Sequence, residues 1–142
     1  RAANEVCNWV HNHTTAEDYV YTLGLYHANQ ILARSERRSS SRYFNQYFIK
    51  TPGVEAEMRR DLAQKPPLYL VMETHRSLSF LEKNQKVPAW IDAMVAGSYH
   101  LEKEVMYPRP TFIDENATGG FLIYRRNSPA AGRSRPADNP GE

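Results

Sequence analysis

The sequence has few of the residues and runs that mark several common protein classes. Cys7 is the only cysteine, so an internal disulfide and a cysteine-based zinc site are both excluded. No run of about 18 apolar residues occurs, so no segment is predicted to span a membrane. The 18 basic and 16 acidic residues leave a net charge of only +2, which gives no general case for binding nucleic acid.

The motifs of several enzyme classes are missing as well. Gly24 is followed by no second glycine, so the dinucleotide-binding fingerprint is absent. The sequence also contains no phosphate-binding loop, no GxSxG nucleophile motif, and no HExxH or HxxxH metal spacing. It therefore predicts no cofactor, no metal and no catalytic residue.

The sequence does contain an alternation of helical and strand patterns. Helices are predicted over 3–13, 25–34, 50–65 and 88–97, and strands over 19–24, 42–48, 68–74, 99–107 and 121–126. Strand 68–74 is apolar on both faces, as a central parallel strand must be. In strand 99–107 apolar and polar residues alternate, which predicts that Leu101, Val105 and Tyr107 face one way. The polar stretch 35–41 is predicted to be a loop.

This alternation predicts a Rossmann-like α/β fold, because parallel strands need a crossover helix each. We expect three layers: a mostly parallel sheet with helices on both faces and an antiparallel hairpin of the last two strands at one edge. Residues 1–126 are expected to form one domain, because 142 residues are too few for two ordinary ones. The remainder, 127–142, is rich in Pro, Gly and Ser and is predicted to be disordered.

Polar side chains follow two of the predicted strands. Tyr26 and His27 come after the first strand, while Glu73, His75 and Arg76 come at the end of the third. Since open α/β sheets bind ligands at the carboxyl ends of their strands, we expect these five residues to face a ligand. No spacing among them predicts a metal site or a catalytic carboxylate pair. A small α/β enzyme using Glu73 and His75 remains an alternative.

Aromatic residues gather in the second predicted strand. Tyr43, Phe44, Tyr47 and Phe48 could stack on sugars or bases, although such residues more often pack a strand against its neighbours. They leave open a second alternative, a stand-alone carbohydrate-binding or interaction module of α/β fold.

Four short segments occur in an order that resembles a known family. They are "DYVYTLG" at 18–24, "SRYF" at 41–44, "KPPLYLVM" at 65–72 and "FLIYRR" at 121–126. Their order and spacing are similar to those of the extracytoplasmic C-terminal domain of C-type polytopic membrane glycosyltransferases. This family includes relatives of the dolichyl-phosphate-mannose–protein mannosyltransferases and the lipid-A aminoarabinose transferases. The resemblance extends over residues 3–126.

The resemblance implies a soluble domain, periplasmic or extracellular, of a membrane-anchored glycosyltransferase that uses a polyprenyl-phosphate-linked sugar donor. Its expected partners are the transmembrane part of the same polypeptide and a glycan or glycolipid acceptor, with no nucleic acid. The family's catalytic carboxylate lies in the membrane part, and no residue here matches it. We therefore expect the domain to assist acceptor binding or stability rather than catalysis. A start at Arg1, with no initiator Met and no helix cap, is expected for a domain that follows a membrane span.

Overall fold

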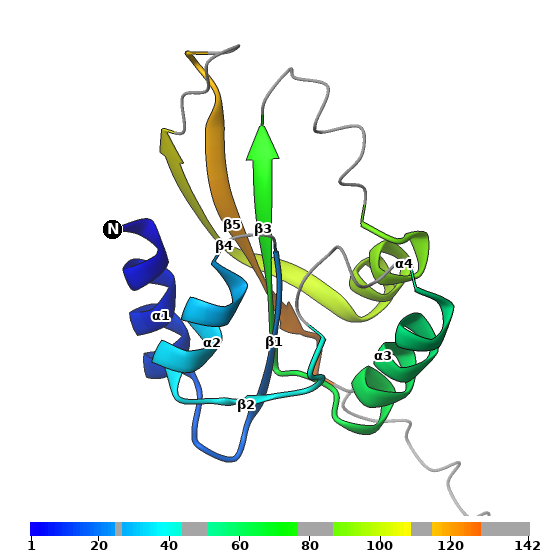
Figure 1. The fold of residues 1–142 in the computed structure, drawn as a ribbon. Coiled ribbons are helices and arrows are strands. Elements are labelled where there is room, and N and C mark those ends of the chain that lie inside the picture. Colours follow the sequence, from blue (N-terminus) through cyan, green and yellow to red (C-terminus); the bar gives the residue numbers. More distant parts are fainter. Residues whose placement is uncertain (25–26, 44–50, 77–86, 109–114, 129–142) are drawn as a thin grey trace, which may run out of the picture.

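A computed structural model describes residues 1–24, 27–43, 51–76, 87–108 and 115–128. Within these ranges the chain forms four helices and one five-stranded sheet (Figure 1), which confirms the predicted α/β class. None of these described helices has the length and apolar character needed to cross a bilayer. Most of the tail predicted to be disordered lies outside the described residues, so that prediction stays untested.

The long elements lie close to their predicted positions. The helices are α1 (Ala2–His13), α2 (Ala28–Ser35), α3 (Pro52–Gln64) and α4 (Ala89–Ser98). The strands are β1 (Tyr19–Leu23), β2 (Arg38–Ser39), β3 (Tyr69–Arg76), β4 (Tyr99–Pro108) and β5 (Thr118–Arg126). Helix α3 begins with proline after Thr51, because the first helical position leaves its N–H unpaired in any case. The Thr51 side chain, however, makes no capping hydrogen bond.

The second strand does not lie where the sequence predicted it. Strand β2 spans only Arg38 and Ser39, inside the stretch predicted to be a loop, and pairs in parallel with β1. Most of the predicted strand 42–48 lies outside the described residues, and its described part, Arg42 and Tyr43, is not in a strand. A strand of two residues is too short to show any apolar periodicity, so the pattern could not reveal it.

The sheet is mixed, which corrects the prediction of a mostly parallel sheet. The strand order is β2-β1-β3-β5-β4, with β1 parallel to β2 and β3, and β5 antiparallel to β3 and β4. Strand β3 is central, as predicted, but only one of its two neighbours is parallel. Its apolar sequence reports burial on both faces and carries no information on the direction of the neighbouring strands. The predicted antiparallel pairing of the last two strands is confirmed.

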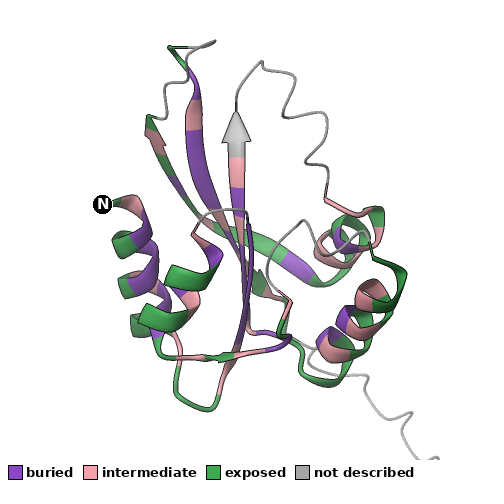
Figure 2. Ribbon diagram, viewed as in Figure 1, coloured by how far each residue is buried: buried purple, intermediate pink, exposed green. Residues whose placement is uncertain are grey.

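Two apolar clusters attach the helices to the sheet. In the first cluster, α1 and α2 contribute Val10 and Ile31, which pack with strand residues such as Val71. In the second, Leu62 of α3 packs with residues of α4 and with Leu70. Neighbouring residues of β3 thus enter different clusters, because successive side chains of a strand point to opposite faces. Figure 2 shows the buried residues of α1 on the side of that helix that faces the sheet.

A β-bulge in β4 changes which of its residues are buried. The residues on either side of Glu102 pair with consecutive residues of β5, so Glu102 is one extra residue in the ladder. An extra residue reverses the alternation of side chains beyond it. Tyr99 therefore packs into the second cluster and Val105 into the first, while Leu101 is 49% exposed. The prediction that Leu101 and Val105 share one face was wrong for this reason.

Candidate functional site

Two of the five residues predicted to face a ligand contact each other. Nδ1 of His27 lies 2.7 Å from Oε1 of Glu73, and the backbone N–H of His27 donates to Oε2 of the same carboxylate at 3.1 Å. Tyr26 lies outside the described residues. His75 and Arg76 continue the backbone of β3, and their side chains also lie outside the described part of the chain. The enzyme alternative pairs Glu73 with His75, whose side chain is not described, and the described contact of Glu73 is with His27.

The parallel pairing of β1 and β3 brings these two residues together. Leu23, the last residue of β1, pairs with Met72, so the next residue of β3, Glu73, lies beside the chain that leaves β1. His27 ends that connection as the residue that precedes α2. Its N–H is one of those that a helix leaves unpaired at its start, so the Glu73 carboxylate also stabilises the beginning of α2.

Gly24 makes the close approach of Glu73 possible. A Cβ atom at position 24 would lie 2.5 Å from Oε2 of Glu73 and 2.7 Å from its Cβ, both far inside van der Waals contact. In the sequence, Gly24 marks the end of the first predicted strand, and nothing there indicates a close approach of Glu73. The structure shows that the absence of a side chain at this position leaves room for the buried carboxylate.

The environment of the pair orients the imidazole of His27. The Glu73 side chain is 2% exposed, whereas that of His27 is 32% exposed. A buried carboxylate is stable only with hydrogen-bond donors around it, and His27 supplies two. The carboxylate favours the proton on Nδ1, which leaves Nε2 as the nitrogen available to a ligand. The ring of Phe121 packs edge-on against the imidazole, with 5.7 Å between centroids.

His27 lines a cavity of about 450 Å³. The polar wall comes from α1, α2 and the residues that precede these helices, and the aromatic wall comes from β4 and β5: Arg1, Asn4, His27, Gln30, Arg34, Tyr107 and Phe121. These described lining residues include two guanidinium groups and no carboxylate. Such a cavity favours a ligand that carries hydroxyl groups or negative charge.

The sequence interpretation missed most of this lining. The sequence contains one weak indication of the lining. His27, Gln30 and Arg34 are spaced three and four residues apart, so they share one helix face. No such indication existed for Asn4 or Tyr107, which reach the cavity from α1 and β4. The Arg34 guanidinium donates a hydrogen bond to Oδ1 of Asn4, which joins the two helices at the cavity wall.

The predicted aromatic cluster is described only at Tyr43, since Phe44, Tyr47 and Phe48 lie outside the described residues. The Tyr43 hydroxyl donates to Oε2 of Glu57 at 3.0 Å. Its backbone carbonyl accepts a 2.6 Å hydrogen bond from the hydroxyl of Tyr21. In the described part of this cluster, the aromatic side chain therefore packs against α3.

The described lining of the site offers hydrogen-bond donors and one imidazole. A carboxylate-held imidazole is able to transfer protons, and the described residues that line the cavity include no serine or cysteine. Cys7 is buried elsewhere, in the first cluster, where burial raises the pKa of its thiol. Within the described ranges, no group of three or more His, Cys, Asp or Glu residues is placed to hold a metal ion.

Comparison of this chain with protein-family models, with curated proteins and with solved structures found no significant match.

Proposed function

We propose that this chain is the soluble extracytoplasmic domain of a membrane-anchored glycosyltransferase, and that it binds the glycan or glycolipid acceptor. The observation that carries the proposal is the cavity beside His27, where buried Glu73 orients an imidazole among amide and guanidinium groups. Sugar acceptors offer hydroxyl groups, and anionic glycans add phosphate or carboxylate. The donors of the cavity match both kinds of group.

The assignment to a glycosyltransferase is supported by the resemblance of the four ordered sequence segments. In this proposal the transmembrane part of the same polypeptide supplies the catalytic carboxylate and binds the polyprenyl-phosphate-linked donor. The domain then lies on the periplasmic or extracellular side and is not catalytic alone. We also propose the finer architecture of three layers with helices on both faces of the sheet, which the two separate apolar clusters support.

The coding sequence upstream of Arg1 tests the wider assignment. We expect it to encode several apolar segments of about 20 residues each, long enough to cross a bilayer. An upstream sequence without such segments would overturn the glycosyltransferase proposal. It would leave the stand-alone carbohydrate-binding module as the interpretation of the same cavity.

Titration of the isolated domain tests the cavity itself. We expect a hexose 1-phosphate to bind saturably in isothermal titration calorimetry, and a neutral disaccharide to bind more weakly. Arg34→Gln should weaken hexose phosphate binding about tenfold, because it removes a charged donor from the cavity. Arg38→Gln is the matched control, since Arg38 lies on β2 and pairs with Glu17 away from the cavity. Equal affinities of wild type and Arg34→Gln would contradict the proposal.

The enzyme alternative makes a different prediction. It requires hydrolase or transferase activity from the domain alone, lost in His75→Ala. The described contact of Glu73 is with His27, and the side chain of His75 lies outside the described residues, so this alternative stays a prediction. An inert domain that still binds hexose phosphate would favour the binding proposal over it.

A further inference from the structure

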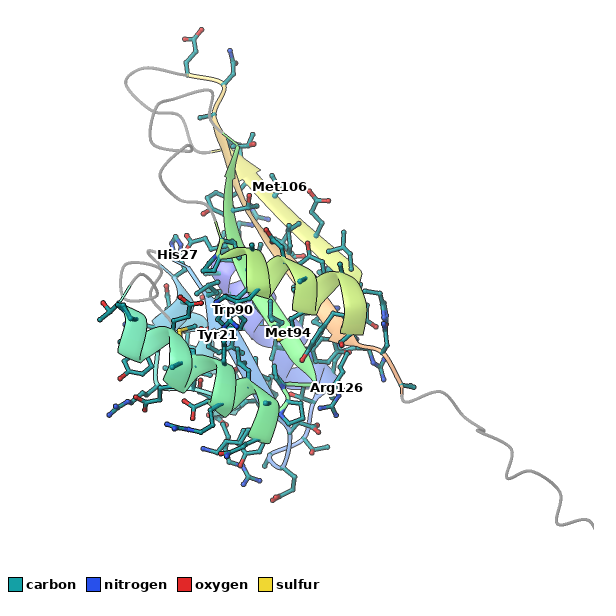
Figure 3. All side chains as sticks on the ribbon, turned by 90° about the vertical axis from the view of Figure 1, so that its right-hand side faces the viewer. Tyr21, His27, Trp90, Met94, Met106 and Arg126 are labelled. Carbon is teal, nitrogen blue, oxygen red and sulfur yellow. The ribbon has the colours of Figure 1, made fainter. Side chains whose placement is uncertain are left out.

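A second cavity, of about 440 Å³, lies between α3 and α4, away from His27. Trp90 and Met94 of α4 lie along it, and Arg126 of β5 lies toward one end (Figure 3). The proposed acceptor site uses none of these residues, so the function of this cavity is a separate question.

The floor of the cavity is apolar and belongs to the core. Leu62 of α3 and Tyr99 of β4 line it, and both are buried in the second apolar cluster. The Tyr99 hydroxyl is turned to a backbone partner, the carbonyl of Pro67, at 2.9 Å. The floor therefore offers a fixed hydrocarbon surface to a ligand.

The rim of the cavity is cationic. Nη1 of Arg126 donates to the carbonyl of Pro66 at 2.8 Å, which fixes its guanidinium at the cavity, and no carboxylate of the described residues pairs with it. The Arg59 guanidinium lies 5.1 Å from the centroid of the Trp90 ring and pairs with Glu55. The described residues that line the cavity include no acidic side chain. Arg126 thus retains N–H groups for an anion.

Trp90 contributes its indole ring to the lining of the cavity. Its Nε1 is buried from solvent and has no hydrogen-bond partner among the described residues. Because this N–H group is closed to solvent, a ligand in the cavity meets the carbon atoms of the indole ring. The cavity therefore combines an apolar floor with a guanidinium that pairs with no described carboxylate.

We propose that this cavity binds an anionic amphiphile. The apolar chain lies on Leu62, Met94 and the Trp90 ring, and the phosphate or carboxylate head contacts Arg126. A neutral apolar ligand would leave the guanidinium without an anion, and a free inorganic anion would leave the apolar floor in water. Only a ligand with both parts satisfies the whole cavity.

Trp90 is also the natural reporter of binding. The chain has two tryptophans, Trp9 and Trp90. Trp9→Phe keeps an aromatic ring beside Tyr69 and leaves Trp90 as the only indole. In this background we expect octyl phosphate and octanoate, below their micelle concentrations, to change Trp90 fluorescence saturably. Inorganic phosphate and neutral octanol should bind at least about tenfold more weakly. A change that does not saturate, or equal binding of octanol, would overturn the proposal.

Neighbouring arginines provide a matched pair of variants. Arg126→Gln should weaken octyl phosphate binding about tenfold or more, because it removes the charged donor. Arg125→Gln should leave octyl phosphate binding unchanged. Nη1 of Arg125 lies 3.5 Å from Oε1 of Glu102, and its guanidinium lies over the ring of Tyr69. Equal effects of the two substitutions would contradict the assignment of the head group to Arg126.

A variant on α4 tests the cavity without touching Arg126. Met94 is partly buried, and Met94→Glu places a carboxylate among the lining residues. We expect it to abolish binding of octyl phosphate through like-charge repulsion while circular dichroism confirms a folded domain. Unchanged binding in this folded variant would also overturn the proposal.

Discussion

Replacement of Gly24 by alanine is expected to destabilise the domain and to separate Glu73 from His27. The added Cβ would lie 2.7 Å from the Cβ of Glu73, which is fixed to the backbone of β3. Rotation of the Glu73 side chain would remove the 2.5 Å contact between the added Cβ and Oε2. It would leave the 2.7 Å contact with the Cβ of Glu73 in place. The chain after β1 and β3 must therefore move apart, and the two hydrogen bonds to His27 lengthen or break.

The magnitude follows from these two effects. Overpacking of a buried site typically costs about 1–3 kcal/mol. Weakening of a hydrogen bond to a charged group adds about 1 kcal/mol or more. We therefore expect Gly24→Ala to lower the free energy of unfolding by about 2–4 kcal/mol, measured by urea denaturation followed by far-ultraviolet circular dichroism. Nuclear magnetic resonance of the His27 ring should show the loss of its Nδ1 hydrogen bond in the same variant.

Gly97→Ala is the matched control. Gly97 lies in α4, and a Cβ atom there would meet nothing within 4 Å. Alanine is the better helix former, so this variant should be as stable as wild type or more stable by up to about 1 kcal/mol. If Gly24→Ala were as stable as Gly97→Ala and kept the His27 signal, the reasoning about close approach would be refuted.

Three further predictions concern buried side chains. Glu73→Gln should lower the free energy of unfolding by about 1–3 kcal/mol in urea, because the amide replaces one acceptor of His27 with a donor; equal stability would contradict this. Burial, the largest cause, raises the pKa of both Tyr69 and Tyr99 to about 12. Unfolded tyrosine loses its proton near pH ~10 while the folded state keeps it, so stability should fall from about pH 10 to 12; a flat pH profile there would count against it. Ellman's reagent should label Cys7 slowly in the folded chain and rapidly in urea, since the thiol is buried, and fast native labelling would disagree.

Local patterns predicted the helices because each carries its own signal. Thr51 and Pro52 mark the start of α3, and the stripe of Met58 and Leu62 marks its buried face. The same reasoning placed β3 at the centre of the sheet from its apolar sequence. A structural feature that depends on one residue could not be predicted from such patterns. The bulge at Glu102 is such a feature, because one inserted residue alters the faces of a strand without altering its composition.

The candidate site was predicted in part. His27 was selected because it follows the first predicted strand, and Glu73 because it lies at the end of the third; the carboxyl ends of such strands meet at one edge of an α/β sheet. Their mutual contact depends on which strands are neighbours, and a pattern within one strand does not contain that information. The second cavity was not predicted at all, because Trp90 and Arg126 belong to elements that meet only through the packing of α4 against the sheet.

The sequence by itself determined the α/β class and the positions of the long helices and strands. These properties depend on periodicity and on chain order, which act over a few neighbouring residues. Only the tertiary structure decided the mixed sheet, the need for glycine at position 24, and the two cavities. Each of these depends on contacts between residues far apart in the chain, where sterics and charge act through space rather than along the sequence.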